Sequence, residues 1–140
     1  MENKRKHLEF IQDTIKRMAG NSFLLRGWSI TLVIATATLA NHSNNLKYLL
    51  ISLFVVVVFW LLDAYYLSQE RKFRCLYDET IKKDETEIDF SMKTIKNHCN
   101  DCELLSSVRS PVFLIFYGLT GLAILLILFV TYLDVTIVFK

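Results

Sequence analysis

The sequence predicts an all-α polytopic membrane protein with three transmembrane helices, the first two forming a helical hairpin that extends into a cytoplasmic stalk. Apolar residues gather in three long blocks, and nearly all charged residues lie between them. A soluble domain instead mixes the two classes along each helix. Blocks of this length indicate that lipid is the solvent. We expect a single membrane domain over 1–140, made of a cytoplasmic amphipathic helix (1–22), a first span (23–40), an outer turn (41–47), a second span (48–67), a cytoplasmic helix and loop (68–110), a third span (111–134) and an outer tail (135–140).

The distribution of Lys and Arg predicts the orientation. Six fall in residues 1–27 and eight in residues 68–110, whereas one lies in 41–47 and one at Lys140. Because short cytoplasmic loops are rich in Lys and Arg, the N-terminus is expected in the cytoplasm and the C-terminus outside. The first apolar block follows a long charged stretch and is not expected to be a cleaved signal. The net charge of +2 gives no reason to expect a nucleic-acid partner.

The short linker 41–47 allows only a tight antiparallel hairpin. If the chain folds back at the centre of this linker, two residues lie at equal depth when their numbers add to about 89, because both helices rise by the same distance per residue. Arg26 then lies opposite Asp63, and an ion pair would offset the cost of two charges in apolar segments. The alternative is that both side chains reach the headgroups independently. The aromatic residues expected at the membrane interfaces are Trp28, Trp60, Tyr65 and Tyr66.

Apolar stripes extend both helices of the hairpin beyond the membrane. Before the first span the stripe contains Leu8, Ile11, Ile15 and Met18; after the second it contains Tyr66, Phe73, Tyr77 and Ile81, with Leu76 beside it. The same antiparallel register pairs the two stripes, which predicts the stalk. In the alternative, the N-terminal stripe lies flat on the membrane as a basic amphipathic helix.

Small residues suggest helix contacts on the first and third spans. Pro111 is suited to a helix start, and Gly118 and Gly121 follow on the third span. The first span offers Ser29, Thr36, Ala37 and Ala40, with Thr31 and Thr38 as further hydroxyls. Close backbone approach and polar contacts drive helix association in lipid, so these residues predict homo-oligomer contacts. In the alternative, the third span of a monomer packs across the hairpin.

Residues with metal-ligand or catalytic chemistry are few. Acidic residues at 84–89 lack the glycine and the ligand spacing of a calcium loop, so a solvated loop is expected. His98, Cys99 and Cys102, with Cys75, do not complete a four-ligand zinc site. A cytoplasmic location predicts reduced thiols for the three cysteines. No nucleophile–base pair or phosphate loop is recognisable, so we expect no enzyme activity, no metal and no cofactor.

Two segments carry a resemblance: Arg17-Met18-Ala19-Gly20-Asn21-Ser22-Phe23-Leu24-Leu25-Arg26-Gly27-Trp28, and Asp63-Ala64-Tyr65-Tyr66-Leu67-Ser68-Gln69-Glu70-Arg71. With them the chain resembles a group of small bacterial membrane proteins without assigned activity, which implies the bacterial inner (cytoplasmic) membrane. In layout it is similar to SLATT-type membrane effectors of bacterial defence systems. The resulting expectation is a homo-oligomer that forms a pore or perturbs the membrane, as a defence or toxin-like effector. The alternative is a membrane-anchored scaffold whose stalk docks a cytoplasmic protein partner.

Overall fold

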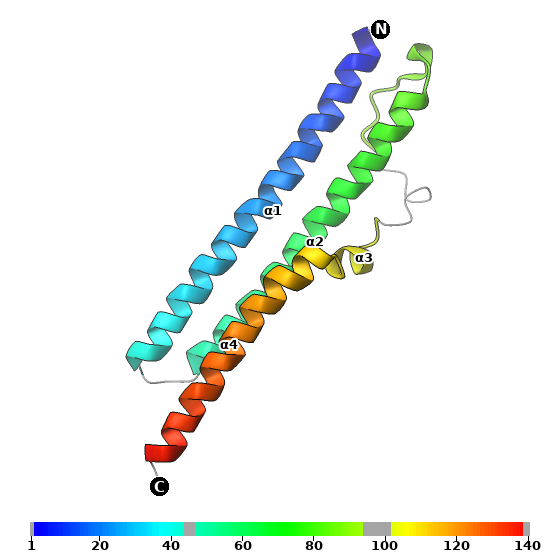
Figure 1. The fold of residues 1–140 in the computed structure, drawn as a ribbon. Helices are drawn as coiled ribbons and strands as arrows, with labels where there is room; N and C mark the ends of the chain where they lie inside the picture. Colours follow the sequence, from blue (N-terminus) through cyan, green and yellow to red (C-terminus); the bar gives the residue numbers. More distant parts are fainter. Residues whose placement is uncertain (1, 44–46, 94–101, 139–140) are drawn as a thin grey trace. The chain divides into compact units, whose positions relative to one another are not determined.

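The fold is all-helical across the part of the chain that the structure, a computed structural model, describes: residues 2–43, 47–93 and 102–138. Its elements are the helices α1 (Glu2–Ser43), α2 (Lys47–Lys82), α3 (Leu104–Val108) and α4 (Pro111–Val138), with a 3₁₀ turn, η1, at Glu85–Glu87 (Figure 1). By length and composition, α1, α2 and α4 are long and apolar enough to cross a membrane. The predicted fold class is therefore confirmed for its helices, and the membrane itself enters as a proposal below.

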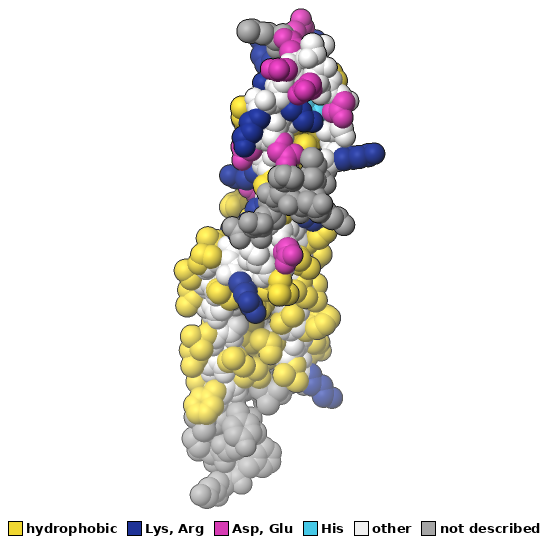
Figure 2. Space-filling view, turned by 90° about the vertical axis from the view of Figure 1, so that its right-hand side faces the viewer, with side chains coloured by type: hydrophobic (Ala, Val, Ile, Leu, Met, Phe, Trp, Pro, Cys, Tyr) yellow, Lys and Arg dark blue, Asp and Glu magenta, His cyan; other side chains and the backbone are white. Residues whose placement is uncertain are grey.

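The chain divides into two compact units, each built from parts of α1 and α2. Unit 1 comprises residues 1–24 and 63–107, and unit 2 comprises residues 25–62 and 108–140. In each unit α1 and α2 run antiparallel, side by side (Figure 1). Most charged residues of the chain belong to unit 1, whereas many of the exposed large hydrophobic side chains belong to unit 2. Both kinds are visible on the face drawn in Figure 2.

Side-chain contacts test the predicted hairpin register within each unit. In unit 2, Thr36 and Ser52 hydrogen-bond through their hydroxyls at 2.6 Å, and their numbers add to 88. In unit 1, Ser22 donates to Asp63, and their numbers add to 85. The register of about 89 therefore holds to about one helical turn. The outer turn, expected at 41–47, falls partly outside the described residues.

The two helix ends in unit 1 are tied together by Lys4. Its ammonium donates to the carbonyl oxygens of Ile81 at 2.7 Å and Lys83 at 2.8 Å. These carbonyls belong to the end of α2, where helical partners run out and a cation is favoured. The N-terminal part of α1 thus pairs with α2, and the cytoplasmic position of this pair stays a prediction.

The buried face of unit 1 differs in part from the predicted stripes. Ile11 is fully buried and Leu76 is buried, but Ile81 is 47 % exposed, so its assignment to the stripe is wrong. The buried face of α2 instead contains Ser68 and Thr80. Both hydroxyls donate to carbonyl oxygens, Ser68 to that of Cys102 and Thr80 to that of Leu76, each at 2.7 Å. Such hydroxyls can be buried at little cost because their hydrogen bonds are made.

The segment after α2 is mostly irregular. The acidic residues at 84–89 form η1 and exposed loop apart from half-buried Ile88, which agrees with the expected solvated loop. Residues 91–93 are not helical. The helix α3 was not predicted.

The third long helix begins where the sequence predicts. It starts at Pro111, and the Ser110 carbonyl accepts hydrogen bonds from the amides of Phe113 and Leu114, both at 3.0 Å. Proline is suited to this first turn because its missing amide has no helical partner. The helix runs to Val138, so the span expected at 111–134 lies within it.

Candidate functional site

A completely buried acidic group lies in unit 1. Asp63 is 0 % exposed and accepts a hydrogen bond from the Ser22 hydroxyl, which is itself buried. Ala64, next to Asp63 on α2, is also fully buried. A small side chain there lets α1 approach α2 closely enough for the short serine to reach the carboxyl group.

Arg26 belongs to unit 2. Its guanidinium lies over the ring of Phe113 on α4, 5.0 Å from the ring centroid, which is a cation–π arrangement. Phe113 is almost completely buried, so this contact joins α1 to α4 in the interior of the unit. The predicted Arg26–Asp63 ion pair would link residues of the two units, and it stays a prediction.

The small residues predicted to mediate oligomer contacts separate into two groups. Ser29 and Ala40 are buried within unit 2, Ala37 is half-buried, and the Thr36 hydroxyl contacts Ser52. These side chains face the interior of the unit.

Gly118 and Gly121 form the second group. A methyl group added at either position would meet no heavy atom of the structure within 4 Å, leaving aside its own helix and chain neighbours. The glycine face of α4 is therefore open. Within unit 2, α4 contacts α1 and α2 through a different face, with Phe113 against Arg26 and the Tyr117 hydroxyl donating to the Phe59 carbonyl, as the alternative of packing across the hairpin expects.

Thr31 and Thr38 give α1 an exposed face within unit 2. Both side chains are exposed, and each hydroxyl donates to a carbonyl of its own helix: Thr31 to Gly27 at 3.0 Å and Thr38 to Ile34 at 2.8 Å. Gly27 is also open to a methyl group. A face with its hydroxyls already bonded is compatible with lipid or with another helix.

The predicted interface aromatics occupy different environments. Trp28 is exposed, and Trp60 is half-buried with its indole N–H donating to the Val108 carbonyl at 3.2 Å. Tyr65 is exposed and meets Tyr66 edge to face, with 5.8 Å between ring centroids. A ring that is apolar on its face and polar at its edge suits a membrane–water boundary.

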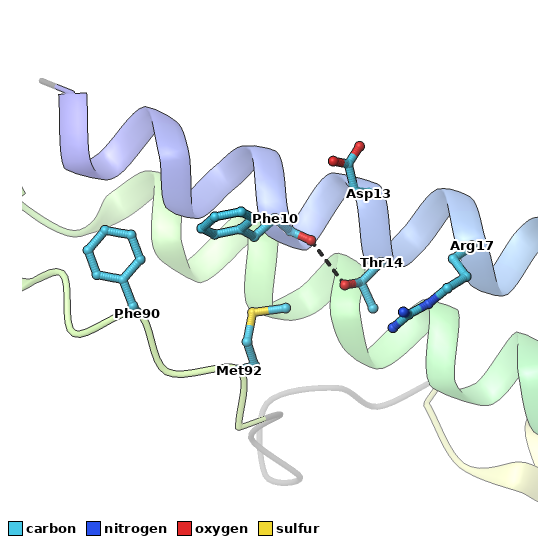
Figure 3. Close-up of a pocket in the computed structure, with 6 residues that line it drawn as sticks. All are labelled: Phe10, Asp13, Thr14, Arg17, Phe90 and Met92. Carbon is cyan, nitrogen blue, oxygen red and sulfur yellow. Dashed lines mark hydrogen bonds between the residues drawn. The ribbon is translucent and has the colours of Figure 1, made fainter.

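A surface hollow in unit 1 was not predicted. Phe10 of α1 and Phe90 and Met92 of the loop line it together with Asp13, Thr14 and Arg17, and its volume is about 530 Å³ (Figure 3). Phe10 is 58 % exposed, and Phe90 and Met92 are also exposed. Phe90 has a φ of 52°, unusual for a residue with a side chain, and its ring meets His7 edge to face. The sequence offered one indication of this hollow, the apolar residue Phe10, which lies outside the predicted apolar stripe of the helix.

The cysteines show one departure from expectation. Cys75 is a free thiol, but Cys102 is disulfide-bonded, so the prediction of three reduced thiols is wrong for Cys102. The prediction used only the expected redox state of the cytoplasm. Within the described residues, no group of three or more His, Cys, Asp or Glu side chains is placed to hold a metal ion. His98 and Cys99 lie outside those residues.

Two titratable groups outside the predicted spans have shifted pKa values. Burial, followed by the nearby carboxylates of Asp78 and Glu79, raises the pKa of the Cys75 thiol. A hydrogen bond from the Ser91 amide lowers the pKa of Asp89, which is exposed. Neither group has a partner arrangement typical of acid–base catalysis.

Comparisons with protein-family models, with curated proteins and with solved structures find no match to this chain.

Proposed function

We propose that this is a small integral protein of the bacterial inner membrane that acts as a homo-oligomer and permeabilises or perturbs that membrane. The described surface of unit 2 supports the membrane part. Its exposed side chains are mainly large and apolar: Trp28, Ile34, Leu50, Phe54, Leu61, Ile115, Leu119, Leu126 and Phe129, among others. Complete burial of a large apolar side chain stabilises a protein by about 1.5–3 kcal/mol relative to exposure to water, and these side chains would lose much of that in water. A lipid environment removes that cost.

The open glycine face of α4 carries the oligomer proposal. Lipid offers no hydrophobic force that brings apolar helices together, so association depends on close backbone contact. Gly118 and Gly121 allow that contact, and no neighbouring side chain in the structure occupies the space beside them. A second copy of the chain is the partner that is always present at the same depth in the membrane.

Membrane perturbation is proposed because catalytic features are weak and the layout resembles SLATT-type effectors. Induced expression in bacteria carrying a membrane-potential dye tests it. Rapid depolarisation, with loss of growth, is the expected result. A normal potential at high levels of inserted protein would contradict the effector function and favour the scaffold.

Leucine variants connect assembly to activity. Gly118→Leu with Gly121→Leu fills the open face, and should abolish both the oligomer in nanodiscs and the depolarisation. Ala123→Leu is a matched control, because Ala123 is also exposed but lies on the opposite side of α4 by helical geometry. A monodisperse monomer for the unaltered chain, or an oligomer indifferent to both leucines, would refute the proposal.

The hollow beside Phe10 favours a second candidate function, a membrane-anchored scaffold that docks a cytoplasmic protein. Exposed apolar groups framed by Asp13 and Arg17 are the composition expected of a partner-binding surface. Phe10→Glu should then remove binding of a co-purifying protein while leaving membrane insertion unchanged. Retention of that protein by the variant would count against docking at this surface.

A further inference from the structure

Two of the three cysteines of the chain lie next to each other in unit 1. Cys75 is on α2, and Cys102 precedes α3. Their sulfur atoms are 3.7 Å apart. A disulfide bond is about 2.05 Å long, so a displacement of less than about 2 Å would join them.

Hydrogen bonds on both sides of the pair fix this approach. The Ser68 hydroxyl donates to the backbone carbonyl of Cys102 at 2.7 Å, and Arg71 donates to the Ser106 hydroxyl at 3.2 Å. Ser68, Arg71 and Cys75 are three and four residues apart, so they share one face of α2. The segment from Cys102 to Ser106 therefore follows that face, and the backbone holds the two sulfurs near each other.

The two sulfurs are in different oxidation states. Cys75 is a free thiol, whereas Cys102 is already in a disulfide. Cys102 is also 5 % exposed, so an external thiol reaches it poorly. A thiol beside a disulfide sulfur is the starting arrangement for thiol–disulfide exchange.

We propose that Cys75 and Cys102 are an exchange pair, in which Cys75 displaces the present disulfide partner of Cys102 to form a Cys75–Cys102 disulfide. Cys75 first loses its proton, and the thiolate attacks the Cys102 sulfur. The Cys75–Cys102 bond forms as the existing disulfide bond of Cys102 breaks. The departing sulfur leaves as a thiolate and takes up a proton. The step is redox-neutral, so it needs no added oxidant.

The surroundings of Cys75 make the exchange slow near neutral pH. Its pKa is raised by burial and by Asp78 and Glu79, which keeps the attacking thiolate scarce. The rate should rise on the order of tenfold per pH unit while Cys75 is mostly protonated, because the thiolate is the nucleophile. The product would close a loop between positions 27 apart in sequence and attach it to α2.

Disulfide mapping of the full-length protein in nanodiscs tests the exchange. Samples are held at pH 7, 8 and 9, quenched with acid and alkylated, and the monomer band of a non-reducing gel is digested for mass spectrometry. Peptides linked through Cys75 and Cys102 should appear and should form faster at higher pH. If Cys75 is fully alkylated at pH 9 and no such peptide forms, even with oxidised glutathione present, the proposal is wrong. A link found only in a dimer band would also overturn it.

Variants separate the chemistry from damage to the fold. Cys75→Ser should abolish the link. Cys99→Ser leaves Cys75 and Cys102 as the two cysteines of the chain. The link should then require oxidised glutathione, which takes up the two electrons and becomes two glutathione thiols. Arg71→Ala should slow the exchange several-fold while the helical circular dichroism is unchanged, because it releases Ser106 without altering a sulfur. An unchanged rate in Arg71→Ala would contradict the positioning argument.

Discussion

The hydrogen bond between Ser22 and Asp63 should be among the strongest single contributions to the stability of unit 1. The carboxyl group is completely buried, and the Ser22 hydroxyl is a donor to it. Ser22→Ala removes that donor and leaves the acceptor in the interior. Because removing one partner of a buried hydrogen bond costs about 1–3 kcal/mol, Ser22→Ala should lower the free energy of unfolding by that amount.

A double-mutant cycle isolates this contact from the other effects of each substitution. Asp63→Ala alone also creates a cavity and removes an acceptor of the Ser22 hydroxyl, so its total cost is not the bond energy. The cycle of Ser22→Ala, Asp63→Ala and the double variant should give a coupling free energy of at least about 1 kcal/mol. Unfolding by titration with a denaturing detergent, followed by circular dichroism, measures all four proteins.

Thr14→Ala is the matched control for this cycle. Its hydroxyl is on the same helix and in the same unit, but donates to the Phe10 carbonyl of its own helix at 3.0 Å (Figure 3). Its removal should change the free energy of unfolding by no more than about 0.5 kcal/mol, as for most surface substitutions. If the costs of Ser22→Ala and Asp63→Ala simply add, or if Thr14→Ala costs as much as Ser22→Ala, the assignment is refuted.

Three further predictions follow from the charges and the thiol. Arg26→Gln and Asp63→Asn should each reduce the folded protein in membranes, since an unpaired charge in an apolar setting costs several kcal/mol in principle, and the double change should recover part of it; additive losses would exclude the pair. A reporter fused after Lys140 should be active only if it senses the outside, and cytoplasmic activity would contradict the predicted topology. In a chain with Cys75 as its sole cysteine, the alkylation rate should keep rising above pH 9.0, the ordinary pKa of a thiol, because the folded protein raises the pKa of Cys75. The protonated thiol therefore contributes stability below pH 9.0, and this contribution is lost as the pH rises through the raised pKa. A rate that levels off below pH 8 would show the opposite shift.

The helices were predictable because their signals extend over many residues. The α1–α2 register followed from one short linker, and contacts in both units lie close to it. The start of α4 followed from Pro111. These features depend on local chemistry and chain geometry, which a single sequence carries.

Side-chain environments were less predictable because they depend on which face meets a neighbour. Ile81 is more apolar than Thr80, yet Thr80 is buried, since its hydroxyl bonds to the Leu76 carbonyl and its position faces inward. Ser22 offered no sequence signal that it would contact Asp63. The apolar hollow depends on Phe90 and Met92, in a loop whose composition suggested only solvent contact. Small polar residues inside helix pairs are thus the part that hydropathy cannot identify.

The contact of Lys4 with the end of α2 also determines when unit 1 can be completed during synthesis. Its two carbonyl acceptors are 77 and 79 residues further along the chain. At about 5–20 residues per second, a ribosome needs roughly 4–16 s to reach them after Lys4 is made. During that interval the Ile11 face of α1 has no α2 to pack against. The nascent N-terminal segment should therefore depend on a chaperone or on the membrane surface until the second helix emerges.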